Sequence, residues 1–117
     1  MTITGVHALL YTPDPEQLRA FLRSLGWPHV EAHDPPDGWQ IFALPPAELG
    51  VHPSDDSTRH ELTFMCDDLQ ATLDELRAHG AEPAGELQDA PFGACVTIVV
   101  PGGVEVLLYE PKHLTAI

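Results

Sequence analysis

Two stretches of the chain place their apolar residues on one side of an α-helix, at intervals of three and four positions. The positions on that side are Leu18, Phe21, Leu22 and Leu25 in the first stretch and Leu69, Thr72, Leu73 and Leu76 in the second. Asp14 and Asp68 precede the stretches, and an aspartate there can accept a hydrogen bond from the first helical turn. Gly26 and Gly80 follow them and are typical of helix ends. The pattern therefore predicts two helices, each bounded by an aspartate and a glycine.

Segments that alternate between apolar and polar residues, or that are rich in β-branched residues, surround both helices and predict strands. We expect strands at residues 4–11, 30–33, 39–44, 48–52, 60–66, 82–87, 93–100 and 104–110. Gly102-Gly103 joins the last two and is a signal for a tight hairpin. The predicted order is a strand, a helix and three strands, and this order occurs twice.

The two halves also repeat one another at a constant offset. The matched pairs are His7 and Glu61, Leu10 and Phe64, Asp14 and Asp68, Leu22 and Leu76, Arg23 and Arg77, and Gly26 and Gly80. Two copies of a curved half-sheet can enclose a cavity that neither copy encloses alone. We therefore predict one α+β domain over residues 1–117, in which two βαβββ modules form a shared cleft from curved mixed sheets. The modules span about 4–53 and 59–112, with a linker at 54–58.

Charge limits the partners that the chain can have. It has 18 Asp and Glu residues against five Lys and Arg residues, which gives a formal net charge of −13. Phosphate-backbone binding needs clustered cations, so we exclude nucleic acid as a partner. The negative charge either favours cationic ligands through its field or serves only to keep the surface soluble.

The chain also lacks the signals of membrane insertion and export. No apolar run reaches the roughly 20 residues that span a bilayer, and no basic stretch followed by an apolar run stands at the start. We therefore expect a cytoplasmic protein with no membrane partner. Cys66 and Cys95 have no metal-type spacing and are expected to be reduced thiols.

Three short sequence motifs resemble those of a known family. His7 precedes Asp14 ahead of the first helix, Phe64-Met65-Cys66-Asp67-Asp68-Leu69 stands ahead of the second, and Val100-Pro101-Gly102-Gly103 stands ahead of the final strand. With the element order, they make residues 4–112 similar to the vicinal oxygen chelate superfamily. This superfamily includes glyoxalase I, extradiol dioxygenases, and fosfomycin-resistance and bleomycin-resistance proteins. The resemblance implies the two-module fold and, because small members usually dimerise, a homodimer.

The resemblance also implies a place for a divalent metal ion such as Fe, Mn, Ni or Zn. In metal-dependent members the first and last strands of each module supply the ligands, and the matching positions here are His7, Gly50, Glu61 and Leu107. A catalytic metal usually needs about three protein ligands, and only His7 and Glu61 of these four qualify. His52, Glu48 or Glu105 could supply a third ligand, because each lies two residues from a matching position on the same strand face.

Strand alternation predicts which side chains face the shared cleft. The expected cleft residues are His7, Leu9, Tyr11, His52, Glu61, Thr63, Met65, Glu105, Leu107 and Tyr109. His60 is expected on the opposite face in a structural role. His7 and Glu61 would bind a metal, recognise a ligand directly or satisfy each other by a hydrogen bond across the cleft. No nucleophile or phosphate-binding loop stands out, so no catalytic residue is assigned.

Three functions remain open at this point. The first is a metal-free protein that holds a small aromatic or cationic organic molecule in a mostly apolar cleft. The second is a divalent-metal-dependent enzyme of the glyoxalase or extradiol dioxygenase type, in which the ion acts as a Lewis acid. The third is an interaction module whose cleft no longer binds a ligand. We favour the first.

Overall fold

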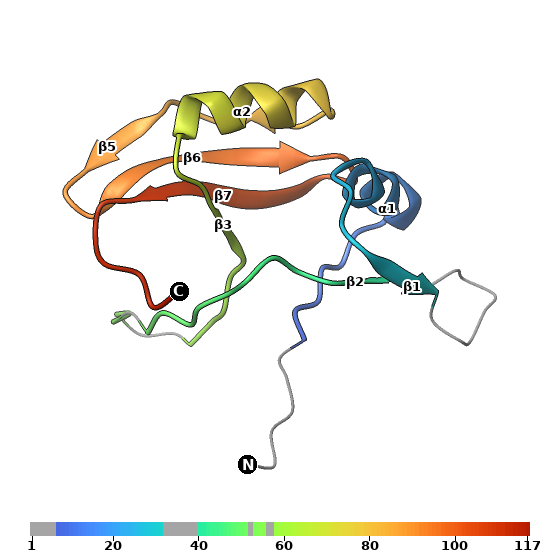
Figure 1. Cartoon of the computed structure of the whole chain (residues 1–117), viewed down its shortest axis with the longest axis horizontal. Coiled ribbons are helices and arrows are strands. Elements are labelled where there is room, and N and C mark those ends of the chain that lie inside the picture. The colour runs from blue at the N-terminus through green and yellow to red at the C-terminus, as the bar shows by residue number, and fades with distance from the viewer. Residues whose placement is uncertain (1–6, 32–39, 52, 56–57) are drawn as a thin grey trace, which may run out of the picture.

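The computed structural model describes residues 7–31, 40–51, 53–55 and 58–117, which form two helices and two sheets (Figure 1). In chain order the elements are α1 (Pro15–Ser24), β1 (His29–Glu31), β2 (Gln40–Phe42), β3 (Thr63–Met65), α2 (Leu69–Ala78), β4 (Glu82–Pro83), β5 (Gln88–Ala90), β6 (Gly93–Val100) and β7 (Val104–Pro111). This mixed arrangement of helices and strands confirms the predicted α+β fold class. Among the described residues, neither helix has the length and apolar character needed to cross a membrane.

The larger sheet is built from the second half of the chain. Its strand order is β3-β7-β6-β4, and β5 also pairs with β6. The final strand β7 lies at the centre, parallel to β3 and antiparallel to β6. Figure 1 shows α2 along one face of this sheet and α1 beside the turn that joins β6 to β7. The second half therefore forms a βαβββ unit in which two short strands, β4 and β5, together occupy the place of the second strand along β6.

Alternation along the long strands β6 and β7 separates two faces of this sheet. The side chains on the helix-facing side are among the most deeply buried of the described residues, with exposures of 0–2 %: Val96, Ile98, Val106 and Leu108. They pack in one cluster with Leu18 and Phe21 from α1 and with the apolar side of α2. The opposite face carries Thr97, Glu105 and Leu107, which are less buried. The core thus lies between the helices and one face of the sheet, and the other face is left for a site.

Both helices begin at the aspartates that the sequence predicts. The Asp14 side chain accepts a hydrogen bond from the Gln17 backbone N–H at 3.3 Å, and the Asp68 side chain accepts one from the Ala71 N–H at 3.0 Å. The second helix has an additional cap from the centre of the sheet, because the Glu110 carboxylate accepts a hydrogen bond from the Leu69 N–H at 2.7 Å. Carboxylates at these positions satisfy free N–H groups and complement the helix dipole.

The first half of the chain has fewer strands than predicted. Its only described pairing is the antiparallel sheet of β1 and β2, and the described residues of the predicted strands 4–11 and 48–52 lie outside any sheet. The predicted strand 60–66 is likewise reduced to β3. Pro45, Pro46 and Pro53 flank the fourth strand of this half and lack the N–H donors that a sheet ladder requires.

Many apolar side chains of this first half are consequently exposed. Tyr11 is 85 % exposed, Leu49 is 91 % exposed and Val51 is 93 % exposed. The half is nevertheless tied to the second half at several points. Thr12 donates a hydrogen bond to the Gly102 carbonyl oxygen, and Trp27 lies edge-on to Phe64 with ring centroids 5.7 Å apart.

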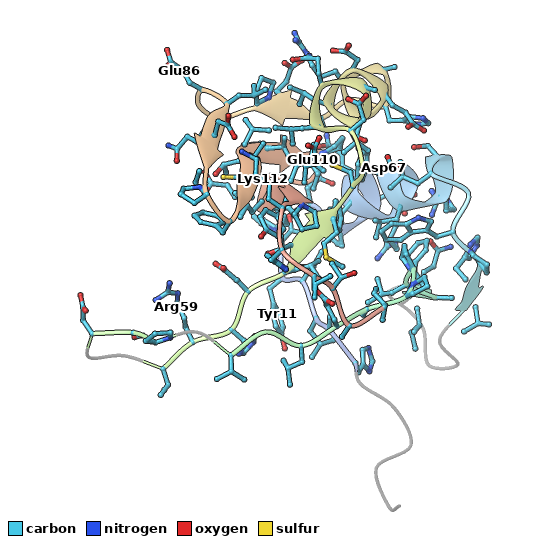
Figure 2. All side chains as sticks on the ribbon, turned by 60° about the vertical axis from the view of Figure 1, so that its left-hand side comes forward. Tyr11, Arg59, Asp67, Glu86, Glu110 and Lys112 are labelled. Atoms are coloured by element: carbon cyan, nitrogen blue, oxygen red, sulfur yellow. The ribbon has the colours of Figure 1, made fainter. Side chains whose placement is uncertain are left out.

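Cys66 lies where β3 leads into α2, on the helix-facing side of the molecule. Its thiol donates a hydrogen bond to the Tyr109 carbonyl oxygen at 3.6 Å. Burial raises the pKa of this thiol, and the carboxylates of Glu110 and Asp67, both near the start of α2 (Figure 2), raise it further. A hydrogen bond with Thr72 acts in the opposite direction. The folded protein therefore holds less Cys66 thiolate at mildly alkaline pH than an unfolded chain does, because a higher pKa keeps the thiol protonated.

Iodoacetamide is thus expected to label Cys66 more slowly in the native protein than in denaturant, at every pH from neutral to mildly alkaline. Glu110→Gln removes a nearby negative charge but retains an oxygen that can cap Leu69, so it should lower the pKa of Cys66 and speed labelling. Mass spectrometry of the labelled peptide across a pH series measures the rate. Glu75→Gln, on the exposed side of α2, is the control and should leave the rate unchanged. A pH profile that Glu110→Gln does not displace would contradict the electrostatic explanation.

Candidate functional site

The larger of the two cavities described lies on the face of the main sheet that the helices leave uncovered. Its volume is about 570 Å³. Four segments line it, with His7, Ala8, Leu9 and Leu10; His60, Glu61 and Leu62; Thr97 of β6; and Glu105, Val106 and Leu107 of β7. We call it the main cavity. The N-terminal segment of the first half therefore meets the entry to β3 and the strands β6 and β7 in one place.

The repeat in the sequence explains why His7 and Glu61 lie in the same cavity. Each precedes the helix of its own half by the same number of residues, and each lies on the segment that enters that half. The central strand β7 adds Glu105 and Leu107 to the same cavity. Leu107 is paired with Thr63 on β3 and with Thr97 on β6. Residues from both halves of the chain thus line the main cavity.

The main cavity combines carboxylates and imidazoles with an apolar wall. Glu61 and Glu105 provide two carboxylates, His7 and His60 provide two imidazoles, and no Lys or Arg is among the lining residues. Four of the five Lys and Arg residues form ion pairs away from the main cavity, and the fifth, Arg59, directly precedes the lining residues His60 and Glu61. Arg19 and Arg23 pair with Glu16, Arg77 pairs with Glu82, and Lys112 pairs with Asp89. The described lining residues therefore contribute two carboxylates and no Lys or Arg, in a chain whose net charge is −13.

The structure distributes the predicted cleft residues between the cavity and its surroundings. Those that line the main cavity are His7, Leu9, Glu61, Glu105 and Leu107. Those that line neither described cavity are Tyr11, Thr63, Met65 and Tyr109. His52 lies outside the described residues. Of the three β7 residues predicted for the cleft, Glu105 and Leu107 line the main cavity and Tyr109 does not.

Tyr109 shows why a correct strand face does not guarantee a place in the cavity. Its hydroxyl donates a hydrogen bond to the Phe92 carbonyl oxygen at 2.8 Å, and its ring lies 6.0 Å from that of Phe92 and 5.7 Å from that of His113. Burial raises the pKa of the Tyr109 phenol, with smaller contributions from Cys95 and Glu48. The side chain therefore fastens the strand β7 to the β5–β6 turn beyond the end of the main cavity.

His60 and Thr97 line the main cavity although the sequence did not assign them to it. His60 was expected on the face opposite Glu61, but regular strand structure begins only at Thr63. Alternation of side chains applies within a paired strand and does not extend to the irregular residues before it. Thr97 could have been found from β6, because it lies opposite Leu107 in the antiparallel pair.

A second, smaller cavity of about 240 Å³ adjoins the main one. Its lining residues are Ala84, Gly85, Glu86, Gln88, Cys95, Val96, Thr97 and Leu107. Thr97 and Leu107 line both cavities, so the two meet on the same face of the sheet. We call this smaller space the side cavity.

The metal site implied by the resemblance does not fit the residues that the structure describes. Of the four matching positions, Gly50 lies outside the main cavity, while Leu107 lines it and has no side-chain ligand to offer. Glu105 shares the cavity with His7 and Glu61. Within the described ranges, however, no three His, Cys, Asp or Glu side chains lie close enough together to hold one metal ion.

Sequence comparisons place this architecture in a family. A comparison with curated proteins finds no significant match. The family model for the Glyoxalase/Bleomycin resistance protein/Dioxygenase superfamily, in contrast, matches residues 5–115, which include both halves of the repeat and every residue of the main cavity. The chain therefore belongs to the Glyoxalase/Bleomycin resistance protein/Dioxygenase superfamily, which is the vicinal oxygen chelate superfamily.

Proposed function

We propose that this protein binds a small organic cation in the main cavity without a metal ion. The observation that carries the proposal is the composition of the lining, which joins two carboxylates to an apolar wall and contains no Lys or Arg. Small-molecule sites are mostly apolar, with a few polar groups that orient the ligand. The volume of about 570 Å³ is within the range of about 300 to 1,000 Å³ that such sites have.

The expected charge of the ligand follows from the ionisable side chains that line the main cavity. A carboxylate only accepts hydrogen bonds, and an organic ammonium ion only donates them, so Glu61 and Glu105 complement an ammonium group in charge and in hydrogen bonding. An anion would meet two like charges with no cation in the lining to offset them. His7 and His60 can each donate or accept, which suits a polar group next to the charge.

Isothermal titration with three ligands of similar shape tests the proposal: butylammonium, butanol and butyrate. Butylammonium is expected to bind, and butyrate is not. Glu105→Gln should weaken butylammonium binding up to about fivefold, because Glu105 is exposed and an exposed ion pair contributes at most about 1 kcal/mol. Glu75→Gln changes the net charge equally but lies on the exposed side of α2, outside both cavities, so it should change the affinity less than about twofold.

Two results would overturn the proposal. The first is equal weakening by Glu105→Gln and Glu75→Gln, which would mean that only the overall charge attracts the cation. The second comes from metal analysis of protein purified without chelator. Near-stoichiometric Fe, Mn, Ni or Zn that is lost in both His7→Ala and Glu61→Gln would replace this proposal with the metal-dependent enzyme.

A further inference from the structure

We infer that the organic cation carries a hydroxyl group on the carbon next to its ammonium group, with Glu105 binding the ammonium and Thr97 binding the hydroxyl. This inference rests on the proposed function and narrows its ligand to a vicinal amino alcohol. The main cavity favours such a ligand because it presents more polar side chains than one ammonium group can use.

Five side chains that line the main cavity can form hydrogen bonds, and none of them has a hydrogen bond or ion pair with another residue in the described part of the chain: His7, His60, Glu61, Thr97 and Glu105. The Thr97 side chain is half-buried and the other four are exposed, so solvent can reach them. A ligand in the cavity takes the place of that solvent. A plain alkylammonium ion offers hydrogen bonds to the carboxylates and leaves the Thr97 hydroxyl unmatched.

Thr97 and Glu105 lie close together on one face of the main sheet. Glu105 is paired with Val99 on β6, and Thr97 comes two residues before Val99, so both side chains project from the face that the helices leave uncovered. Diagonal neighbours of this kind are about 7–8 Å apart. A vicinal amino alcohol holds its nitrogen and oxygen on adjacent carbons, and each can form a hydrogen bond of about 2.8–3.0 Å. One such ligand can therefore reach both side chains at once.

The hydrogen-bonding roles of the two side chains agree with this assignment. The Glu105 carboxylate only accepts hydrogen bonds, as a partner of an ammonium group must. The Thr97 hydroxyl both donates and accepts, and so does the hydroxyl of the ligand. Because Thr97 carries no charge, its side chain gives a second ammonium group no advantage over a hydroxyl.

Isothermal titration with three four-carbon cations tests the inference: butylammonium, 1-amino-2-butanol and 4-amino-1-butanol. The wild-type protein is expected to bind 1-amino-2-butanol at least about threefold more tightly than butylammonium, which is the gain from one hydrogen bond. In 4-amino-1-butanol the hydroxyl lies at the far end of the chain from the ammonium group. This cation should therefore gain less than about twofold.

Variants of Thr97 show whether its hydroxyl causes the preference. Thr97→Val keeps the β-branched shape and removes the hydroxyl, so it should bring the affinities for 1-amino-2-butanol and butylammonium to within about 1.5-fold of each other. Thr97→Ser retains a hydroxyl and should keep the wild-type ratio. Thr63→Val is the matched control, because Thr63 lies on β3 and lines neither described cavity, and it should also keep the ratio. Circular dichroism checks that each variant is folded.

The outcomes separate this inference from the proposed function. If butylammonium binds and 1-amino-2-butanol binds no more tightly, the hydroxyl is not recognised, and the inference is rejected while the proposed function stands. If Thr97→Val keeps the wild-type preference, the hydroxyl is bound elsewhere and the inference is likewise rejected. If neither cation binds, the proposed function fails, and the inference fails with it.

Discussion

Leu108→Ala is expected to lower the free energy of unfolding by about 3–4 kcal/mol, a large part of what a domain of this size has. Leu108 is fully buried on the central strand β7, opposite Val96 on β6 and Phe64 on β3. Truncation removes the contacts of this side chain with the core between the sheet and the helices. It also leaves a void, because β3 and β6 hold the backbone of β7 in place on each side. Urea unfolding followed by circular dichroism measures the change.

The adjacent residue is the control for this prediction. Leu107 lies on the same strand but faces the two cavities, and it is only partly buried. Leu107→Ala should therefore cost about 1 kcal/mol, since it removes less apolar surface from a packed environment. Equal losses for the two variants would show that both faces of β7 are packed alike, which would contradict an open cleft on the Leu107 face.

Gly93→Ala is expected to lower the free energy of unfolding by about 2–3 kcal/mol. A Cβ at this position would lie 2.5 Å from the Glu110 carbonyl oxygen and 2.5 Å from Cε1 of Tyr109. The Tyr109 ring cannot move away freely, because its hydroxyl is bonded to the Phe92 carbonyl oxygen. The strands β6 and β7 must therefore separate where their ladder begins, next to the β5–β6 turn.

Thermal unfolding of Gly93→Ala and Gly85→Ala provides the comparison. Gly85→Ala places its Cβ in open space, so it should change stability by less than about 1 kcal/mol, or raise it by restricting the unfolded chain. A melting temperature for Gly93→Ala that equals that of Gly85→Ala would mean that the close approach of Tyr109 to Gly93 is relieved at no cost.

The helices were predictable because their signals are local. The apolar period from Leu18 to Leu25 and the aspartate caps lie within a few residues of one another, and the structure confirms both helices with Asp14 and Asp68 as their caps. The hairpin of β6 and β7 was also predictable from a local signal, because Gly102-Gly103 stands between two segments of β-branched and apolar residues. Its predicted strands, 93–100 and 104–110, agree with the structure to within one residue.

The strands of the first half were harder to predict, because pairing in a sheet depends on partners far along the chain. Residues 7–11 and 48–51 alternate or carry apolar residues as strands do, yet they have no ladder in the described structure. A segment with a similar pattern in the second half forms the strand β3, because the long central strand β7 pairs with it. The pattern of a single segment does not state whether such a partner exists.

The candidate site was predictable to the extent that the repeat determines it. The repeat matches His7 with Glu61 and alternation along β7 adds Glu105 and Leu107, and all four residues line the main cavity. The prediction from side-chain alternation was wrong for His60, because this residue precedes the first residue of β3. Sequence reasoning also missed the side cavity, because Gly85 and Gln88 come from an irregular segment and a short strand whose position depends on pairing with β6.

The helix α1 packs against strands that are synthesised much later, and this order affects when the core can form. Leu18 and Phe21 near the N-terminus pack with Val100, Val106 and Leu108, and a Cβ on Gly102 would lie only 2.9 Å from that of Leu18. The ribosome adds about 5–20 residues per second, so these apolar groups stay without their partners for on the order of ten seconds. The central strand β7 is also made last, and the larger sheet cannot assemble before it emerges. The apolar side chains of α1 therefore stay exposed on the nascent chain until β6 and β7 have been synthesised.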